Sequence, residues 1–176
     1  MISLLEQTLC YVAEEQFESL VFLFPLPADP GVPAPAVAEW TTVSVGFTGP
    51  FGGRLYLAVP SAMLAVLGSN MLGTDEPGAS PDEQIDALKE LIHVVCGNLL
   101  PAIAGDEAVF DVEAPRLLGA GAAPQFPGAV PAAATRVLLD AGPAELWLSL
   151  DRPVAQLDLP DGEALAWVAP PAPRHA

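Results

Sequence analysis

Residues 81–100 read PDEQIDALKELIHVVCGNLL, and this stretch decides the fold. Apolar side chains recur along it at the i, i+4, i+7, i+11 spacing of one helix face, at Leu88, Ile92, Val95 and Leu99. The spacing predicts a helix over 81–100 that buries this face in the core of the domain.

The opposite side of the same predicted helix carries polar residues at the same spacing: Asp86, Glu90, His93 and Gly97. An ordinary solvated face mixes lysine with glutamate, whereas this one has two carboxylates, an imidazole and then a glycine. Two interpretations stay open. The row is either a plain solvated face or a surface that contacts a partner protein. Gly97 is either a weak point of the helix or leaves room for the partner's backbone.

The overall composition predicts one globular domain. A chain of 176 residues with 52% apolar content can bury a core without disulfides or metals. We assign residues 1–168 to a single domain and residues 169–176 to a disordered tail.

The charge balance argues against a nucleic-acid partner. Six lysines and arginines stand against 22 acidic residues, a formal net charge of −16 that repels phosphodiester backbones. The arginines are scattered along the sequence and predict no cationic cluster. If the protein acts on phosphate, the cations must therefore come from a partner.

No unbroken apolar run approaches the ~18–20 residues of a membrane span, and the N-terminus lacks the pattern of a signal peptide. Cys10 and Cys96 lie in apolar helical contexts and are expected to be buried thiols in a reducing compartment. We therefore expect a cytoplasmic protein with no membrane partner.

The first half of the chain predicts a helix, a connector, a hairpin and a second helix. An amphipathic pattern covers residues 2–24 and ends at Pro25, and residues 25–39 form an extended Pro/Ala connector. Alternating apolar residues over 41–59 predict a hairpin. A short helix over 62–72, capped by Ser61, follows it.

The second half continues after the long helix, which we expect to kink or end at Pro101. A strand over 108–113, a mobile low-complexity loop over 119–134 and a hairpin over 136–140 and 144–151 are predicted next. Short edge segments are expected at 154–159 and 164–168. This order predicts an α+β two-layer sandwich, a mainly antiparallel sheet covered by helices.

The element order and the long helix resemble the CheX/CheC family of chemotaxis phosphatases over roughly residues 1–151, and CheX-like domains in particular. The family signature is Asp or Ser, three residues, Glu, two residues, Asn, and then twenty-one residues to Pro. Asp86, Glu90 and Pro115 occupy three of these four positions, and His93 stands where the family has Asn.

The resemblance implies a function for these residues. In the family, the helix face enters the phosphorylated site of a response regulator, the Glu pairs with a regulator lysine, and the Asn holds the attacking water. Glu90 and His93 would then be the catalytic residues, and Asp86, Gly97 and Pro115 would contact the partner. No cofactor is expected beyond the Mg²⁺ that the regulator holds, since the catalysis is chiefly positioning and electrostatics.

The histidine leaves alternatives open. A neutral imidazole is both donor and acceptor, like an amide, so His93 could orient the water or accept its proton. It could equally abolish hydrolysis and leave a module that only binds a regulator or another signalling partner. A third interpretation is an oligomerisation domain that forms a homodimer through a free sheet edge, as the family's dimers do. A metal site at Glu90 and His93 is not expected, because no further ligands lie nearby in the sequence.

Overall fold

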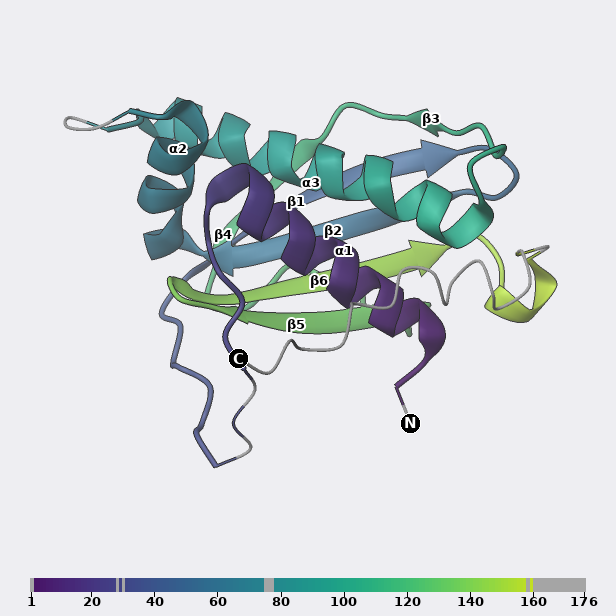
Figure 1. Cartoon of the computed structure of the whole chain (residues 1–176), viewed down its shortest axis with the longest axis horizontal. Coiled ribbons are helices and arrows are strands. Elements are labelled where there is room, and N and C mark those ends of the chain that lie inside the picture. The colour runs from purple at the N-terminus through teal and green to yellow at the C-terminus, as the bar shows by residue number, and fades with distance from the viewer. Residues whose placement is uncertain (1, 28, 30, 75–77, 158, 160–176) are drawn as a thin grey trace, which may run out of the picture.

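Within residues 2–27, 29, 31–74, 78–157 and 159, which the computed structural model describes, three helices cover one face of a six-stranded antiparallel sheet (Figure 1). The elements follow the chain in the order α1 (Leu4–Val21), β1 (Trp40–Thr48), β2 (Gly53–Pro60), η1 (Ser61–Met63), α2 (Leu64–Leu72), α3 (Pro81–Ala104), β3 (Asp111–Val112), β4 (Arg116–Gly121), β5 (Ala133–Leu139), β6 (Gly142–Leu150) and η2 (Val154–Gln156). The predicted α+β two-layer sandwich is confirmed.

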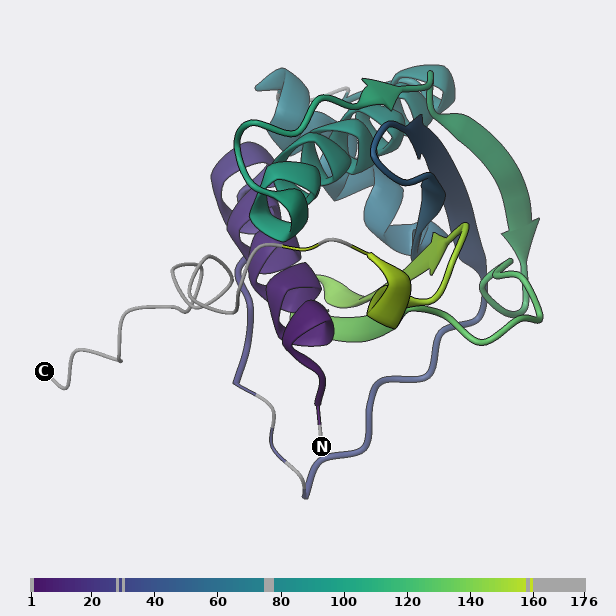
Figure 2. The ribbon, with the colours of Figure 1, turned by 90° about the vertical axis from the view of Figure 1, so that its right-hand side faces the viewer.

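The sheet is built around the β1–β2 hairpin. Its strand order is β3-β1-β2-β6-β5, and β4 pairs with β1 on the same side as β3. β3 and β4 thus form one interrupted edge, and β5 forms the other. Seen from the side, the helices lie on one side of the strands, and the segment that follows β4 lies at the opposite side (Figure 2).

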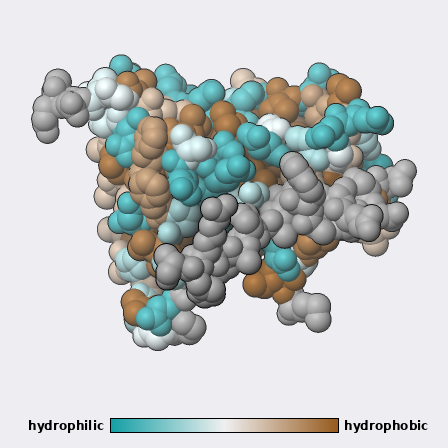
Figure 3. Space-filling view, in the orientation of Figure 1, coloured by the Kyte–Doolittle hydropathy of each residue, from teal (hydrophilic) through white to brown (hydrophobic). Residues whose placement is uncertain are grey.

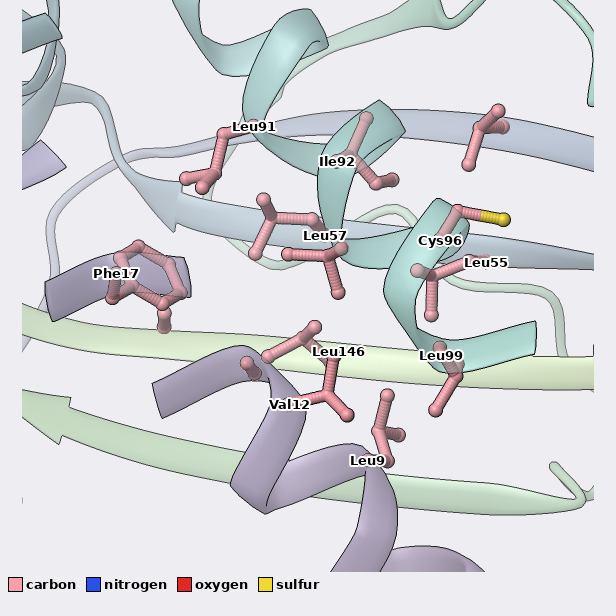
Figure 4. Packing of buried hydrophobic residues seen from close by; sticks show 14 of the residues in the cluster. Leu9, Val12, Phe17, Leu55, Leu57, Leu91, Ile92, Cys96, Leu99 and Leu146 are labelled. Atoms are coloured by element: carbon pink, nitrogen blue, oxygen red, sulfur yellow. The ribbon is translucent and has the colours of Figure 1, made fainter. Parts of the chain in front are cut away.

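The core lies between the helices and the sheet. α3 contributes its apolar face, on which Leu88, Ile92, Val95 and Leu99 have no exposed surface. Figure 4 shows α3 and α1 directing apolar side chains toward Leu55 and Leu57 of β2 and Leu146 of β6. The buried stripe that the sequence predicted therefore packs where one layer meets the other.

The ends of α3 follow from local chemistry. Ser80 caps the helix, because its hydroxyl accepts from the backbone N–H of Glu83 while the Glu83 carboxylate accepts from the N–H of Ser80. Pro81 occupies the first turn, where a missing N–H costs nothing. Asp82 and Glu83 sit favourably at the positive end of the helix dipole.

The expectation for the other end was partly wrong. α3 continues through Pro101 to Ala104 and ends at Gly105, which has a φ of 86°. Pro101 has no N–H to donate to the carbonyl of Gly97, so one helical hydrogen bond is missing inside the helix. Ile103 is completely buried beyond the proline, and its packing explains why the helix persists.

α3 also has the length and composition of a membrane span. Its most apolar 18-residue window has a mean hydropathy of 1.4, but half of that window is buried inside the domain. Because the buried half packs against the sheet and the other helices, this hydropathy is what a core helix requires.

Two predictions for the first half need correction. α1 ends at Val21, before Pro25, because Phe22 takes a left-handed conformation with a φ of 53°. Ser61 does not cap α2; its hydroxyl is 2.8 Å from that of Thr41, and a short 3-10 turn leads into the helix.

The predictions for residues 108–134 were less accurate. Within the expected strand, residues 111–112 form β3, and β4 begins at Arg116 and extends into the segment predicted as a loop. The remainder of that segment is anchored to the sheet, since the N–H of Gln125 donates to the Thr42 hydroxyl at 3.0 Å. The sequence did not predict β4, because this glycine-containing edge strand has no alternating apolar pattern. Its pairing with β1 holds it in place.

The last hairpin is confirmed, although its turn lies at residues 140–141, just before the predicted Gly142-Pro143. The expected edge segment at 154–159 contains the 3-10 turn η2 and no paired strand among its described residues. The expected segment at 164–168 and the predicted tail at 169–176 lie outside the described residues.

The packing of α3 generates a stability prediction. Ile92→Ala removes a completely buried side chain and should lower the free energy of unfolding by about 2–5 kcal/mol. His93→Ala, one position along the same helix but exposed, is the matched control and should change it by no more than about 0.5 kcal/mol. Urea unfolding of the two variants checks this, and similar losses for both would contradict the assignment of the two faces.

Candidate functional site

The polar row on α3 lies on the surface of the domain. Asp86, Glu90, His93 and Gly97 are all exposed, while the residues between them on the other face are buried. A helix rises ~1.5 Å per residue, so the row extends over ~16 Å from Asp86 to Gly97. On the side of the molecule that carries α1 and α3, hydrophilic residues are spread among hydrophobic ones (Figure 3).

The two residues predicted to be catalytic have no internal partner. Neither Glu90 nor His93 makes a hydrogen bond or ion pair with any residue that the structure describes, apart from the helix backbone. Their Cβ atoms, three positions apart on one helix face, are ~5–6 Å from each other. A carboxylate acceptor and an imidazole are therefore presented side by side to the solvent.

Asp86 begins the row with a weak internal contact. Its carboxylate is 3.6 Å from the Lys89 Nζ, and the Asp86 side chain is 75% exposed. A surface pair of this kind contributes about 0–1 kcal/mol, so a stronger cation on a partner could replace the lysine.

The far end of the row is open. A Cβ added to Gly97 would meet nothing within 4 Å. Asn98, the next residue, does not replace the amide that the family motif has at position 93, because its Nδ2 donates to the Val94 carbonyl at 2.8 Å. The helix thus presents two acids and an imidazole, and then, at Gly97, one position without a side chain.

Pro115 is the one predicted site residue that does not lie on α3. It is half-buried in the link between β3 and β4, two strands that both contact α3. The structure therefore brings Asp86, Glu90, His93 and Gly97 onto one face and places Pro115 on an adjoining segment of the sheet edge.

Metal and thiol chemistry find no support in the described part of the chain. No group of three or more His, Cys, Asp or Glu side chains gathers there to hold a metal ion. Burial raises the pKa of the Cys96 thiol to about 12, and burial also raises the pKa of the half-buried Cys10 thiol. Both thiols are therefore poor nucleophiles near neutral pH.

Sequence reasoning missed one arrangement of charged residues. Arg54 and Arg116, which are 62 positions apart in the sequence, line the same cavity on the face of the sheet opposite the helices. The prediction that the arginines form no cluster is therefore wrong for Arg54 and Arg116. Arg54 occupies an outward position in the alternating pattern of β2, but the register of β4 is not visible in the sequence.

The central part of the chain is similar to a known family. Residues 41–123 match the family model for the chemotaxis phosphatase CheX. This span holds all five predicted site residues. No curated protein matches the sequence.

Solved structures of chemotaxis proteins share the fold. A CheX from Desulfovibrio desulfuricans has a TM-score of 0.61 at 15% identity, covering 84% of this chain and 99% of that one. CheX from Vibrio vulnificus has a TM-score of 0.62 at 15% identity, covering 84% and 96%. CheX in a CheX–CheY–BeF3–Mg²⁺ complex from Borrelia burgdorferi has a TM-score of 0.58 at 14% identity, covering 83% and 97%. The resemblance that the sequence suggested is confirmed.

Gly97 gives a test of the open end of the row. Gly97→Ala should raise the free energy of unfolding by about 1 kcal/mol, because alanine favours a helix interior and the added methyl meets no other atom. Gly73→Ala is the matched control: its Cβ also meets nothing, but its φ of 62° should make alanine destabilising by about 1 kcal/mol. Urea unfolding measures both, and a loss of stability at Gly97 would show that the position is not open.

The Cys96 thiol gives a pH prediction. The folded state holds this proton more tightly than the unfolded state, so the thiol's contribution to stability is complete below pH 9.0, its ordinary pKa, and is lost progressively toward about 12. The free energy of unfolding should therefore fall more steeply over this range in the wild type than in Cys96→Ala. Equal slopes in urea titrations would rule out a buried thiol at this position.

Proposed function

We propose that this chain, whose CheX-like domain places Glu90 and His93 on an open helix face, accelerates hydrolysis of the aspartyl phosphate of a response regulator. Two observations together support the proposal. Glu90 and His93 are exposed with no internal partner in the described structure, and the chain has a CheX-like fold with a match to the CheX family model. The complex of a CheX with CheY supports a receiver domain as the partner.

Hydrolysis of an aspartyl phosphate requires few catalytic groups from this chain. In the regulator, Mg²⁺ and a lysine already neutralise the phosphoryl oxygens, so a phosphatase must chiefly position water and complete the electrostatics. We therefore expect this chain to need no cofactor of its own.

Each side chain then has one role. Glu90 pairs with the regulator's lysine and fixes the register of α3 in the phosphorylated site. His93 holds a water in line with the phosphorus; the water oxygen bonds to phosphorus as the bond to the aspartyl oxygen breaks. A neutral imidazole can accept the proton that the water releases, and phosphate and a free carboxylate are the products.

The remaining residues of the site shape the contact. Asp86 exchanges its weak pair with Lys89 for a contact to the partner, and Gly97 lets the partner's backbone approach the helix. Pro115 sets the path of the adjoining edge between β3 and β4. A response regulator of two-component signalling is cytoplasmic, so the proposal also implies a cytoplasmic location.

A module that binds a regulator without hydrolysis is the second candidate. The imidazole at position 93 favours it, because a histidine is longer and bulkier than the asparagine of the family motif and could fill the space of the attacking water. A homodimer through a sheet edge stays a prediction. Part of the β5 edge is already occupied, since the N–H of Leu26 donates to the Leu138 carbonyl at 2.8 Å.

A phosphatase assay separates the two candidates. A panel of receiver domains is phosphorylated with a small-molecule phosphodonor, and phosphate loss is followed with wild type, Glu90→Ala, His93→Ala and His93→Asn. The proposal expects acceleration by the wild type and a loss of roughly a hundredfold in His93→Ala, the scale of a lost acid–base or positioning group. Glu90→Ala should weaken regulator binding by at least about tenfold, the scale of a lost charged hydrogen bond.

Glu18→Ala is the matched control, because it removes the same charge from an exposed position on α1. It should leave the rate unchanged. Binding of a BeF3-treated receiver domain without any acceleration of phosphate loss would establish the binding module, and a gain of activity in His93→Asn would show that the imidazole is the impairing group. No binding and no acceleration across the panel would overturn both candidates.

A further inference from the structure

The face of the sheet opposite the helices is partly covered by the segment that follows β4 (Figure 2). Gln125 anchors the segment through its N–H bond to Thr42. Phe126 stacks on Trp147 with ring centroids 5.4 Å apart, and meets the edge of Tyr56 at 6.3 Å. The segment therefore places the ring of Phe126 against two aromatic side chains on the outer face of the sheet.

An open pocket of about 500 Å³ lies beside this segment on the outer face of the strands. Its lining residues come from β1, β2, β4 and the covering segment: Ser44, Arg54, Tyr56, Arg116, Leu118, Gln125, Phe126 and Pro127. The lining includes two arginines and no acidic residue, although acidic residues outnumber basic ones 22 to 6 in the chain. The volume lies within the usual range of small-molecule sites, ~300–1,000 Å³.

Strand register explains why the two guanidinium groups meet. Arg116 of β4 lies directly opposite Ser44 of β1, which in turn lies opposite Tyr56 of β2. Arg54, two residues before Tyr56 on the same face, donates from Nη1 to the Ser44 hydroxyl at 3.2 Å. Arg116 is the directly opposite neighbour of Ser44, a spacing of ~4.5–5.5 Å at Cβ, and Arg54 is diagonal to Ser44, so both arginines flank one serine.

The charge of the cavity is positive after internal pairing. Arg54 donates to the Glu113 carboxylate at 2.8 Å, which compensates one cation. Gly46 makes this pair fit, since a Cβ there would collide with both the Glu113 carboxylate and the Arg54 guanidinium. Arg116 forms no ion pair with any described residue, so one positive charge stays available.

We propose that this cavity binds a small organic anion, with a carboxylate or phosphate against Arg116 and Arg54 and a planar apolar part against Phe126 and Leu118. Guanidinium groups match the geometry of both oxyanions and form the stronger, charge-assisted hydrogen bonds. The Tyr56 hydroxyl and the Gln125 amide add donors that a neutral apolar ligand would leave unused. The acidic surface elsewhere is screened beyond the ~8–10 Å Debye length at physiological salt.

The site lies across the sheet from α3, so it is independent of the proposed phosphatase function. Calorimetric titration of the full chain at physiological salt, where the remote acidic surface is screened, tests it with four probes: adenosine monophosphate, benzoate, inorganic phosphate and adenosine. The first two combine an anion with a planar ring and should bind. Phosphate should bind more weakly because it lacks the ring, and adenosine should not bind because it lacks the charge.

Variants locate the binding. Arg116→Ala should weaken binding of the ring-bearing anions by roughly tenfold to a hundredfold, the scale of hydrogen bonds to a charged group. Arg116→Gln, which keeps a polar NH2 donor but removes the charge and shortens the side chain, should lose a similar factor. Arg152→Ala is the matched control: Arg152 pairs with Asp151 outside the cavity and should bind like the wild type.

Three results would overturn the proposal. These are the absence of binding by both ring-bearing anions, unchanged affinity in Arg116→Ala with its thermal unfolding preserved, and equal losses in Arg116→Ala and Arg152→Ala. Phosphate binding as tightly as adenosine monophosphate would refute the part assigned to Phe126 and Leu118.

Discussion

The burial of one face of α3 is the constraint on which the rest of the structure depends. Leu88, Ile92 and Leu99 are completely buried against the sheet and the neighbouring helices. Because side chains on a helix are fixed relative to each other, burying these residues forces Glu90 and His93 outward. The face that carries Glu90 and His93, the proposed functional face, is therefore positioned by the hydrophobic core and needs no hydrogen bond of its own to hold it.

The same separation divides the molecule into two chemically different sides. The helical side presents acids and an imidazole from a regular element. The opposite side of the sheet presents arginines and aromatic rings, and it is shaped by an irregular segment that Phe126 and Gln125 anchor. A protein with a net charge of −16 thus keeps two of its few cations together, away from the acidic row on α3.

Sequence patterns predicted what depends on local periodicity. The 3.6-residue repeat revealed α3 and both its faces, and the period of two revealed the hairpins, because each regular element must bury one side. Patterns failed where pairing is decided by distant residues. β4 is held by β1, and the meeting of Arg116 with Arg54 follows from a register that includes a β-bulge opposite Thr42 and Val43. The predicted end of the helix at Pro101 was wrong for the same reason, because the tertiary packing of Ile103 outweighs a local helix breaker.

Because Pro101 has no N–H, the exposed face of α3 carries a backbone acceptor that no side-chain substitution at its own position can remove. The carbonyl of Gly97 lacks its usual donor four residues on, and the residue is open to solvent. Water or a donor from another molecule can satisfy it. This acceptor belongs to the main chain, so replacing the residue at position 97 would change access to it but not remove it, and only loss of the proline would close the helical ladder.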